Sequence, residues 1–152
     1  MPTHVNGLEE LMSLSGSDLG RTNWLEITQE RVNTFADATD DHQWIHTDPE
    51  RAAAGPFGGP IAHGYLTLSL IIPLFGELLE ITGTSLSVNY GLEKVRFPHP
   101  VPVGARIRLH GAVDAVEKVK GNGVQMQMTF TVEAEGSDKP VCVARAVHRH
   151  YA

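Results

Sequence analysis

The sequence predicts an α+β protein in which a group of helices precedes a sheet of antiparallel strands. Three observations support this. The first 60 residues favour helices, because apolar residues recur there at helical spacing behind N-cap signals. The segment Ile61–Leu79 is apolar on nearly every side, which is typical of a helix buried all round. Everything after Thr82 alternates between apolar and polar residues or is bounded by turn residues, so it reads as strands. A curved antiparallel sheet can wrap such a helix.

The helical part of the chain contains several expected elements. They are a short apolar helical face from Leu8 to Leu14, a strand over Trp24–Ile27, a helix from Thr28 to about Ala38, and a helix that starts at Asp48-Pro49. Thr28 and Asp48 are good N-caps because their side-chain oxygens can accept a hydrogen bond from the first turn. Pro49 suits the first helical position. Within Ile61–Leu79, Pro73 predicts a kink or an early end of the helix.

The strands are expected to form an antiparallel meander. Gly91 separates two apolar runs, Ser85–Tyr90 and Leu92–Phe97, and predicts a bulge. The turn Gly121-Asn122-Gly123 separates the next strand from Gln125–Glu133, and Val141–His150 forms the last strand.

Size and composition favour one domain covering residues 1–152, large enough to bury about two thirds of its unfolded surface. A net charge of −6 without a basic cluster argues against nucleic acid or an anionic membrane as a partner. Cys142 is the single cysteine and should pack in a strand. The N-terminus does not read as a signal peptide, and the apolar run Ile61–Phe75 is too short to span a bilayer. We therefore expect a cytoplasmic, soluble protein.

Asp41 and His46 are the first candidates for catalysis. An aspartate and a histidine in a loop between helices usually cap a helix end or face solvent, so spacing alone favours a structural role. Trp44 and Ile45 lie between them, however, and should anchor the loop and fix the geometry that acid/base chemistry needs. A metal site at His42 and His46 would need both rings on one continuous helix and a third ligand. We expect no metal.

Gly64 is the second candidate. It follows a glycine-rich turn, Gly58 to His63, and opens the long apolar helix. Glycine near a helix start can serve close packing. Alternatively, the N–H groups there can face a developing oxyanion. The sequence leaves these two interpretations equal. His63 reads as a hydrogen-bonded structural histidine, and the other histidines, His148 and His150 among them, are assigned no role.

The run Asp41–His46 resembles the signature of the R-specific enoyl-CoA hydratases, the MaoC-like dehydratases. The resemblance continues through Gly59–Gly64, Asn89–Phe97 and Pro100–Gly104, and so covers about Leu19 to His150. The signature is specific when these blocks occur in this order. The chain departs from it at three positions: Asp40 replaces a small residue, Gln43 the commoner asparagine, and Trp44 the commoner proline. At these three positions the chain resembles a mycobacterial-type single-domain branch of the family.

The resemblance implies a hot-dog fold, in which the sheet wraps the central helix, and a homodimer. It implies reversible hydration of a trans-2-enoyl-CoA or acyl-carrier thioester to the (3R)-3-hydroxyacyl thioester, in fatty acid metabolism. Asp41 and His46 would hold and activate the water, and the Gly64 N–H would stabilise enolate charge. Asn89, Tyr90 and Gly91 would line the path of the thioester and pantetheine. No cofactor is implied, because the addition needs only polarisation and proton transfer.

Two other functions remain open at this point. A hot-dog thioesterase would direct water at the carbonyl and release free thiol. A non-catalytic acyl-thioester-binding subunit of a heterodimer is the other alternative, and the presence of both Asp41 and His46 argues against it.

Overall fold

The computed structural model describes all 152 residues and contains eight strands and five helices. In chain order they are β1 (Thr3–Asn6), α1 (Gly7–Met12), β2 (Asp18–Arg21), β3 (Leu25–Glu26), α2 (Gln29–Thr39), α3 (Trp44–Thr47), α4 (Pro49–Ala53), α5 (Gly64–Phe75), β4 (Leu79–Thr82), β5 (Leu86–Arg96), β6 (Arg106–Val119), β7 (Gly123–Ala134) and β8 (Cys142–Tyr151). No helix is long and apolar enough to cross a membrane.

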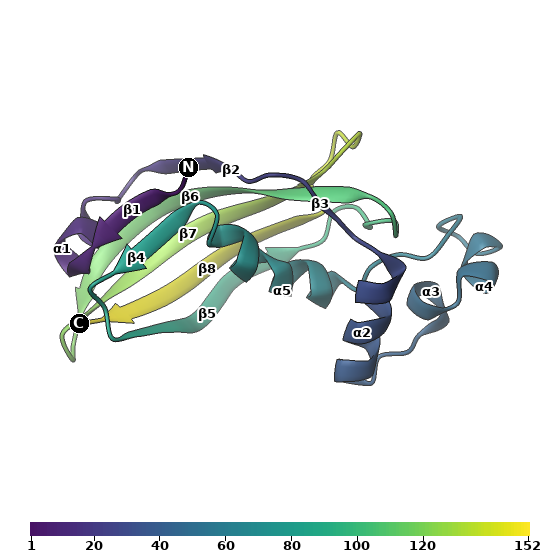
Figure 1. Cartoon of the computed structure of the whole chain (residues 1–152), viewed down its shortest axis with the longest axis horizontal. Helices are drawn as coiled ribbons and strands as arrows, with labels where there is room; N and C mark the ends of the chain where they lie inside the picture. Colours follow the sequence, from purple (N-terminus) through teal and green to yellow (C-terminus); the bar gives the residue numbers. More distant parts are fainter.

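One long sheet dominates the structure and curls around α5 (Figure 1). Its strand order is β2-β6-β7-β8-β5, with β3 paired to β6, and all these pairs are antiparallel. Alternate residues of β6, β7 and β8 are buried and pack on α5 as one apolar core. The α+β prediction is confirmed. Cys142 lies in this core, where burial raises the pKa of its thiol to about 11.

The strand pairing differs from a simple meander. Only β6, β7 and β8 follow one another across the sheet, whereas β5 pairs with β8 and not with its sequence neighbour β6. The chain must therefore cross from one edge of the sheet towards the other between residues 96 and 106. The expected bulge is present, because the register of β5 against β8 shifts between Asn89 and Gly91.

The central helix is shorter than the expected Ile61–Leu79. Residues before Gly64 hydrogen-bond to distant backbone instead: Ile61 N–H donates to Ile45, and Ala62 N–H to Val101. Pro73 lacks an N–H, and the helix ends two residues later at Phe75. Nor is the helix buried on every side, since Tyr65 and Ile72 are 71% and 45% exposed.

The chain ends also differ from the expectation. Leu79, predicted as the last helical residue, begins β4, which pairs in parallel with β1 in a separate two-stranded sheet. Neither β1 nor β2 was predicted, because the first 60 residues were expected to be mainly helical. The predicted N-caps are confirmed: the side chain of Thr28 accepts a hydrogen bond from Arg31 N–H, and that of Asp48 from Arg51 N–H.

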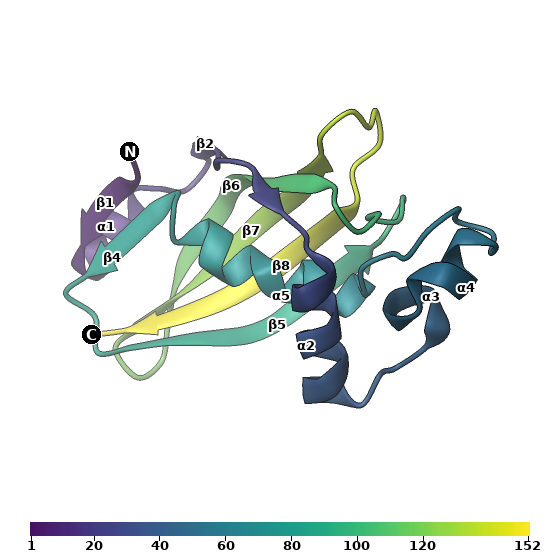
Figure 2. The ribbon, with the colours of Figure 1, turned by 45° about the vertical axis from the view of Figure 1, so that its right-hand side comes forward.

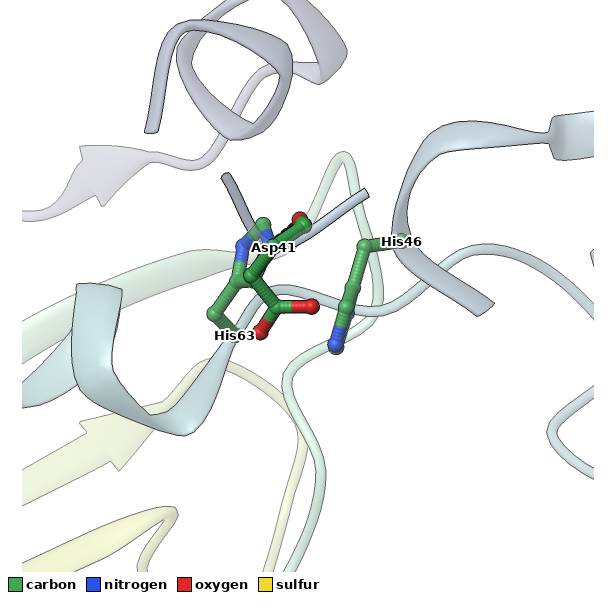
Figure 3. Close-up of side chains that lie close together, drawn as sticks. All are labelled: Asp41, His46 and His63. Carbon is green, nitrogen blue, oxygen red and sulfur yellow. Dashed lines mark hydrogen bonds between the residues drawn. The ribbon is translucent and has the colours of Figure 1, made fainter. Parts of the chain in front are cut away.

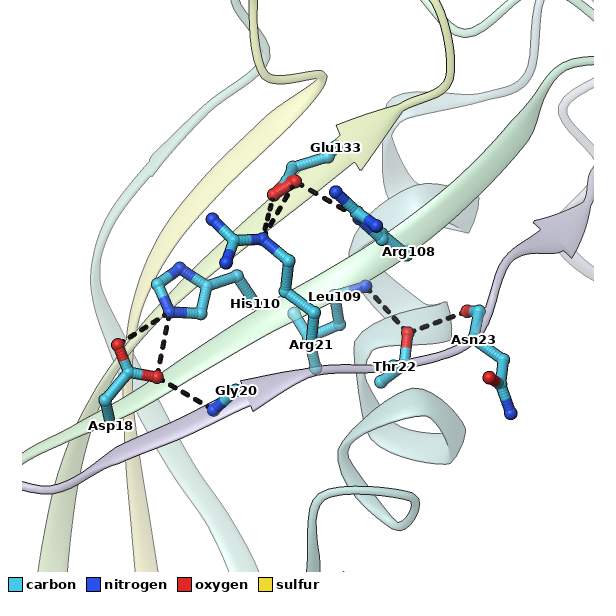
Figure 4. A network of polar contacts seen from close by, with 9 residues as sticks. All are labelled: Asp18, Gly20, Arg21, Thr22, Asn23, Arg108, Leu109, His110 and Glu133. Atoms are coloured by element: carbon cyan, nitrogen blue, oxygen red, sulfur yellow. Dashed lines mark hydrogen bonds and ion pairs between the residues drawn. The ribbon is translucent and has the colours of Figure 1, made fainter. Parts of the chain in front are cut away.

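Polar contacts on the outer face of the sheet hold β2 against β6 (Figure 4). His110 contacts the Asp18 carboxylate at 3.0 Å, and Glu133 accepts from Arg21 at 2.7 Å and from Arg108 at 3.3 Å. Thr22 completes the set by accepting from Leu109 N–H. Helices α2, α3 and α4 gather beyond one end of the sheet, opposite to the end that holds both termini (Figure 2). The N-terminus of α5 points towards that helical end.

Candidate active site

Asp41 sits where the chain turns from α2 into α3. The turn is made by Asp40, which caps α2 in the left-handed conformation with φ of 58°, a region that aspartate tolerates better than most residues. Trp44 and Ile45 are half-buried, and the Arg51 guanidinium lies over the Trp44 ring at 4.4 Å. The Ile45 carbonyl accepts from Ile61 N–H at 2.9 Å. Packing on both sides therefore fixes the loop, as the sequence predicted.

His46 is held in one tautomer. It is only 7% exposed, and its Nδ1 lies 2.7 Å from the Ile61 carbonyl oxygen. Because a carbonyl only accepts, Nδ1 carries the proton and Nε2 keeps a free lone pair. Burial is the largest influence on the pKa of His46 and lowers it. The hydrogen bond to Ile61 raises this pKa, His63 lowers it, and Asp41 raises it, but the net result is a pKa below the usual value. The ring is thus a neutral base near pH 7.

His63 lies directly beside this base. Its ring stacks on that of His46 with centroids 3.9 Å apart, and the other side meets Phe35 at 4.8 Å. His63 Nε2–H donates to the Asp41 carbonyl at 3.0 Å, which ties the loop to the start of α5. It is hydrogen-bonded, as predicted for a structural histidine, but its Nδ1 is buried without a partner. The sequence analysis did not assign His63 to the site. Its position directly before Gly64 was the one feature of the sequence that could have indicated this.

Asp41, His46 and His63 form one cluster (Figure 3), in which one potential ligand atom from each lies within 4.8 Å of the others. The Asp41 carboxylate is exposed, whereas both imidazoles are buried. A carboxylate and two imidazoles are ligand types that zinc accepts. His42, considered with His46 as a metal pair, instead lies 3.7 Å from the Asp37 carboxylate. His42 precedes α3 and so does not share one continuous helix with His46, and the potential ligand set is a different trio.

Gly64 begins α5 next to this cluster. The N–H groups of Leu66 and Thr67 both donate to the His63 carbonyl, which leaves those of Gly64 and Tyr65 at the open end of the helix. A Cβ on Gly64 would lie 3.2 Å from three carbons of the Phe97 ring. The lack of a side chain therefore lets the Phe97 ring lie close to Gly64, and the free N–H groups are compatible with anion binding. Both interpretations of Gly64 remain physically sound.

A cavity of about 490 Å³ lies between α5 and the sheet. It is lined mainly by apolar side chains of α5, β5, β7 and β8, starting at Leu68, one turn after Gly64. Asn89 and Gly91, on either side of the β5 bulge, also line it. Tyr90 is not among its lining residues; its ring lies under the Arg149 guanidinium at 3.6 Å. Of the three β5 residues named from the sequence, two thus face the cavity.

The fold and site define a class of protein: one antiparallel sheet wrapped around a central helix, with a histidine and an aspartate at the helix N-terminus, is a hot-dog fold of the hydratase type. The comparison with protein families agrees, since residues 12–136 match the MaoC-like domain. The chain belongs to the MaoC-like family.

Individual relatives resemble the chain over nearly its whole length. It is 52% identical over 143 residues to 3-hydroxyacyl-thioester dehydratase Z of Mycobacterium tuberculosis, covering 94% of this chain and 95% of that protein. It is 40% identical to nodulation protein N of Rhizobium meliloti, with 93% and 89% covered. Among solved structures, the (R)-hydratase of A. caviae involved in PHA biosynthesis superposes with a TM-score of 0.73 at 28% identity, covering 88% of this chain and 94% of that one.

Proposed function

We propose that this protein catalyses the reversible hydration of trans-2-enoyl thioesters to (3R)-3-hydroxyacyl thioesters. The observation that carries the proposal is the pairing of a neutral, buried His46, whose Nε2 is free, with the exposed carboxylate of Asp41. The names of the M. tuberculosis dehydratase and the A. caviae hydratase support the same reaction.

His46 acts as the base in this reaction. A water molecule between the two side chains donates one hydrogen bond to His46 Nε2 and the other to the Asp41 carboxylate. As the water oxygen bonds to the β-carbon, its proton moves to Nε2, and the electron pair of the C=C bond moves towards the thioester oxygen. The imidazolium then delivers a proton to the α-carbon, which restores the neutral ring and completes the addition. Asp41 orients the water and stabilises the transient positive charge on His46.

Gly64 stabilises the intermediate. The enolate that forms between the two proton transfers carries its charge on the thioester oxygen. The free N–H of Gly64, at the positive end of the α5 dipole, donates to that oxygen. The apolar cavity beyond the first turn of α5 takes the acyl chain, and Asn89 and Gly91 border its entry along β5.

The deciding experiment follows the loss of absorbance of the enoyl-thioester band with crotonyl-, octenoyl- and dodecenoyl-CoA. Asp41→Asn and His46→Gln should each lower kcat/KM by roughly 10²–10⁴-fold while the circular dichroism spectrum stays native. Asp40→Asn is the matched control, because Asp40 caps α2 and its side chain lies outside the cluster. Free thiol release without absorbance loss would identify a thioesterase instead. Equal losses from Asp40→Asn and Asp41→Asn would contradict the assigned roles.

We also propose that the protein is a homodimer joined through β5. This strand is the edge of the sheet, and ten of its eleven residues are exposed. Leu86, Val88, Tyr90 and Leu92 leave between 38% and 58% of their surface open. Such a long apolar edge pairs readily with a second copy. Sedimentation should give a dimer, and Val88→Lys should weaken it; a stable, active monomer of 16.6 kDa would contradict the proposal.

A further inference from the structure

The cavity along α5 is apolar over most of its length but reaches a histidine of β8. His148 is 8% exposed and lies against Phe75 and Phe130, with ring centroids 5.9 and 6.2 Å away. Its side chain lines the cavity and makes no side-chain hydrogen bond within the chain, so its ring nitrogens are left to whatever occupies the cavity. A largely buried imidazole usually has a hydrogen-bond partner in the protein or in an ordered water molecule.

A second buried imidazole lies beyond the first. A further cavity of about 340 Å³ shares Ile72, Asn89 and His148 with the cavity of 490 Å³, so the His148 ring stands between the two. His150 lines this further cavity, with its ring centroid 6.3 Å from that of His148. Its Nδ1 shares a hydrogen bond of 2.8 Å with the Ser87 hydroxyl, and its Nε2 is buried without a partner.

Both rings are neutral at pH 7. Burial, together with the neighbouring His150, lowers the pKa of His148 to about 4. Burial also lowers the pKa of His150. A neutral imidazole has one N–H donor and one acceptor nitrogen. The part of the cavity beside His148 therefore offers uncharged hydrogen-bonding groups, which suit a hydroxyl or a ketone better than a methyl terminus or a carboxylate.

The length of α5 indicates which part of an acyl chain would reach these groups. Ile72, which borders both cavities, lies eight residues after Gly64, or roughly 12 Å along the helix at about 1.5 Å per residue. An extended hydrocarbon chain with bonds of about 1.5 Å advances roughly 1.3 Å per carbon. A thioester carbonyl at Gly64 thus places roughly the tenth to twelfth carbons beside His148.

We propose that His148, assisted by His150, selects acyl thioesters that carry a hydroxyl or keto oxygen about ten to twelve carbons from the thioester carbonyl. This inference rests on the proposed function for the position of the thioester. A polar chain end hydrogen-bonds to His148, whereas a plain alkyl end leaves this ring unpaired and displaces water from it. Sites built to bond a polar substrate group discriminate strongly against analogues without it.

The test compares trans-2-dodecenoyl-CoA with 11-hydroxy-trans-2-dodecenoyl-CoA. In the unmodified protein, kcat/KM for hydration should be at least about tenfold higher for the hydroxylated chain. Crotonyl-CoA, with four carbons, and octenoyl-CoA, with eight, do not reach His148, so failure to hydrate either of them and dodecenoyl-CoA as well would refute the proposed function. Hydration of crotonyl-CoA together with equal rates for the two long chains would overturn this inference alone. Calorimetric Kd values for the two saturated C12 thioesters make the same comparison without turnover, and equal values would overturn it too.

Variants then assign the preference to His148. His148→Leu should remove the preference for the hydroxylated chain, and His148→Asn, which retains a donor and an acceptor, should restore part of it. His110→Leu is the matched control, because His110 lies on the outer face of the sheet against Asp18. A preference that survives His148→Leu, or that His110→Leu removes equally, would show that His148 does not select the chain. If His148→Leu does not fold, the two-substrate comparison in the unmodified protein remains decisive.

Discussion

Gly64→Ala separates the two roles that the structure leaves open for this residue, close packing and oxyanion donation. The added methyl would lie 3.2 Å from three carbons of the Phe97 ring. Because carbon atoms pack best at about 3.5–4.0 Å, the ring must shift by roughly 0.5 Å. Phe97 is 44% exposed, so it can move towards solvent.

The cost to stability should therefore be small. Overpacking a closed core costs about 1–3 kcal/mol, and an exposed ring should stay at or below the lower end of that range. Replacing glycine by alanine recovers about 0.4–1 kcal/mol, because the unfolded chain loses conformational freedom. The two contributions nearly cancel, so Tm should change by no more than about 2–4 °C.

Activity should respond differently. The N–H is retained, but the displaced ring and the methyl crowd the thioester oxygen, so we expect kcat to fall by about tenfold. Gly64→Pro removes the donor, and kcat should then fall by 10²–10³-fold, the usual loss for one oxyanion donor. Enoyl-thioester absorbance measures kcat, and thermal unfolding followed by circular dichroism gives Tm.

Two controls make the comparison informative. Gly59→Ala adds a methyl with no atom within 4 Å and should leave kcat unchanged and raise Tm by no more than about 2–4 °C. Phe97→Ala combined with Gly64→Ala should recover most of the lost kcat if crowding by the ring causes the loss. Full activity in Gly64→Pro, or losses that follow Tm at both glycines, would refute the oxyanion role.

Three further predictions concern pH and metals. Since burial lowers the pKa of His46, the fall of kcat/KM with decreasing pH should be centred below 6.5, the ordinary value for histidine, and a fall centred above 6.5 would contradict this. His148, with its pKa lowered to about 4, is neutral when folded but binds a proton when unfolded between pH 4 and 6.5. The unfolding free energy should therefore drop as pH falls through that window, by up to about 3 kcal/mol from this residue, and urea unfolding at pH 7.5 and 4.5 should show a smaller drop in His148→Leu. Dialysis against EDTA should leave hydration unchanged, whereas added Zn²⁺ should inhibit by binding Asp41, His46 and His63; activity lost to EDTA and restored by Zn²⁺ would instead make the metal part of the reaction.

The sequence predicted best those features that depend on neighbours in the chain. The N-caps at Thr28 and Asp48 and the bulge at Gly91 depend on a few adjacent residues, and the structure confirms all three. Alternation within a strand identifies its buried face, so the inward residues of β7 were predictable too. The loop that carries Asp41 and His46 was found because its apolar anchors lie between them. Their catalytic roles stay predictions, as do those of Gly64, Asn89, Tyr90 and Gly91.

Strand partners were beyond the reach of local patterns. An alternating strand fits beside any other, so nothing local distinguished β8 from β6 as the partner of β5. Likewise, Leu79 continues an apolar helical run, and only pairing with β1 across 76 residues makes it a strand residue.

The sequence by itself determined the α+β class, the central helix and the Asp41–His46 loop, because periodicity and spacing act over a few residues. Tertiary structure alone decided that His63 stacks on His46 and that the Ile61 carbonyl fixes the His46 tautomer. It also decided that His148 lines an apolar cavity. Each of these is a contact between segments far apart in the chain, and such contacts exist only once the helix and the sheet have packed together.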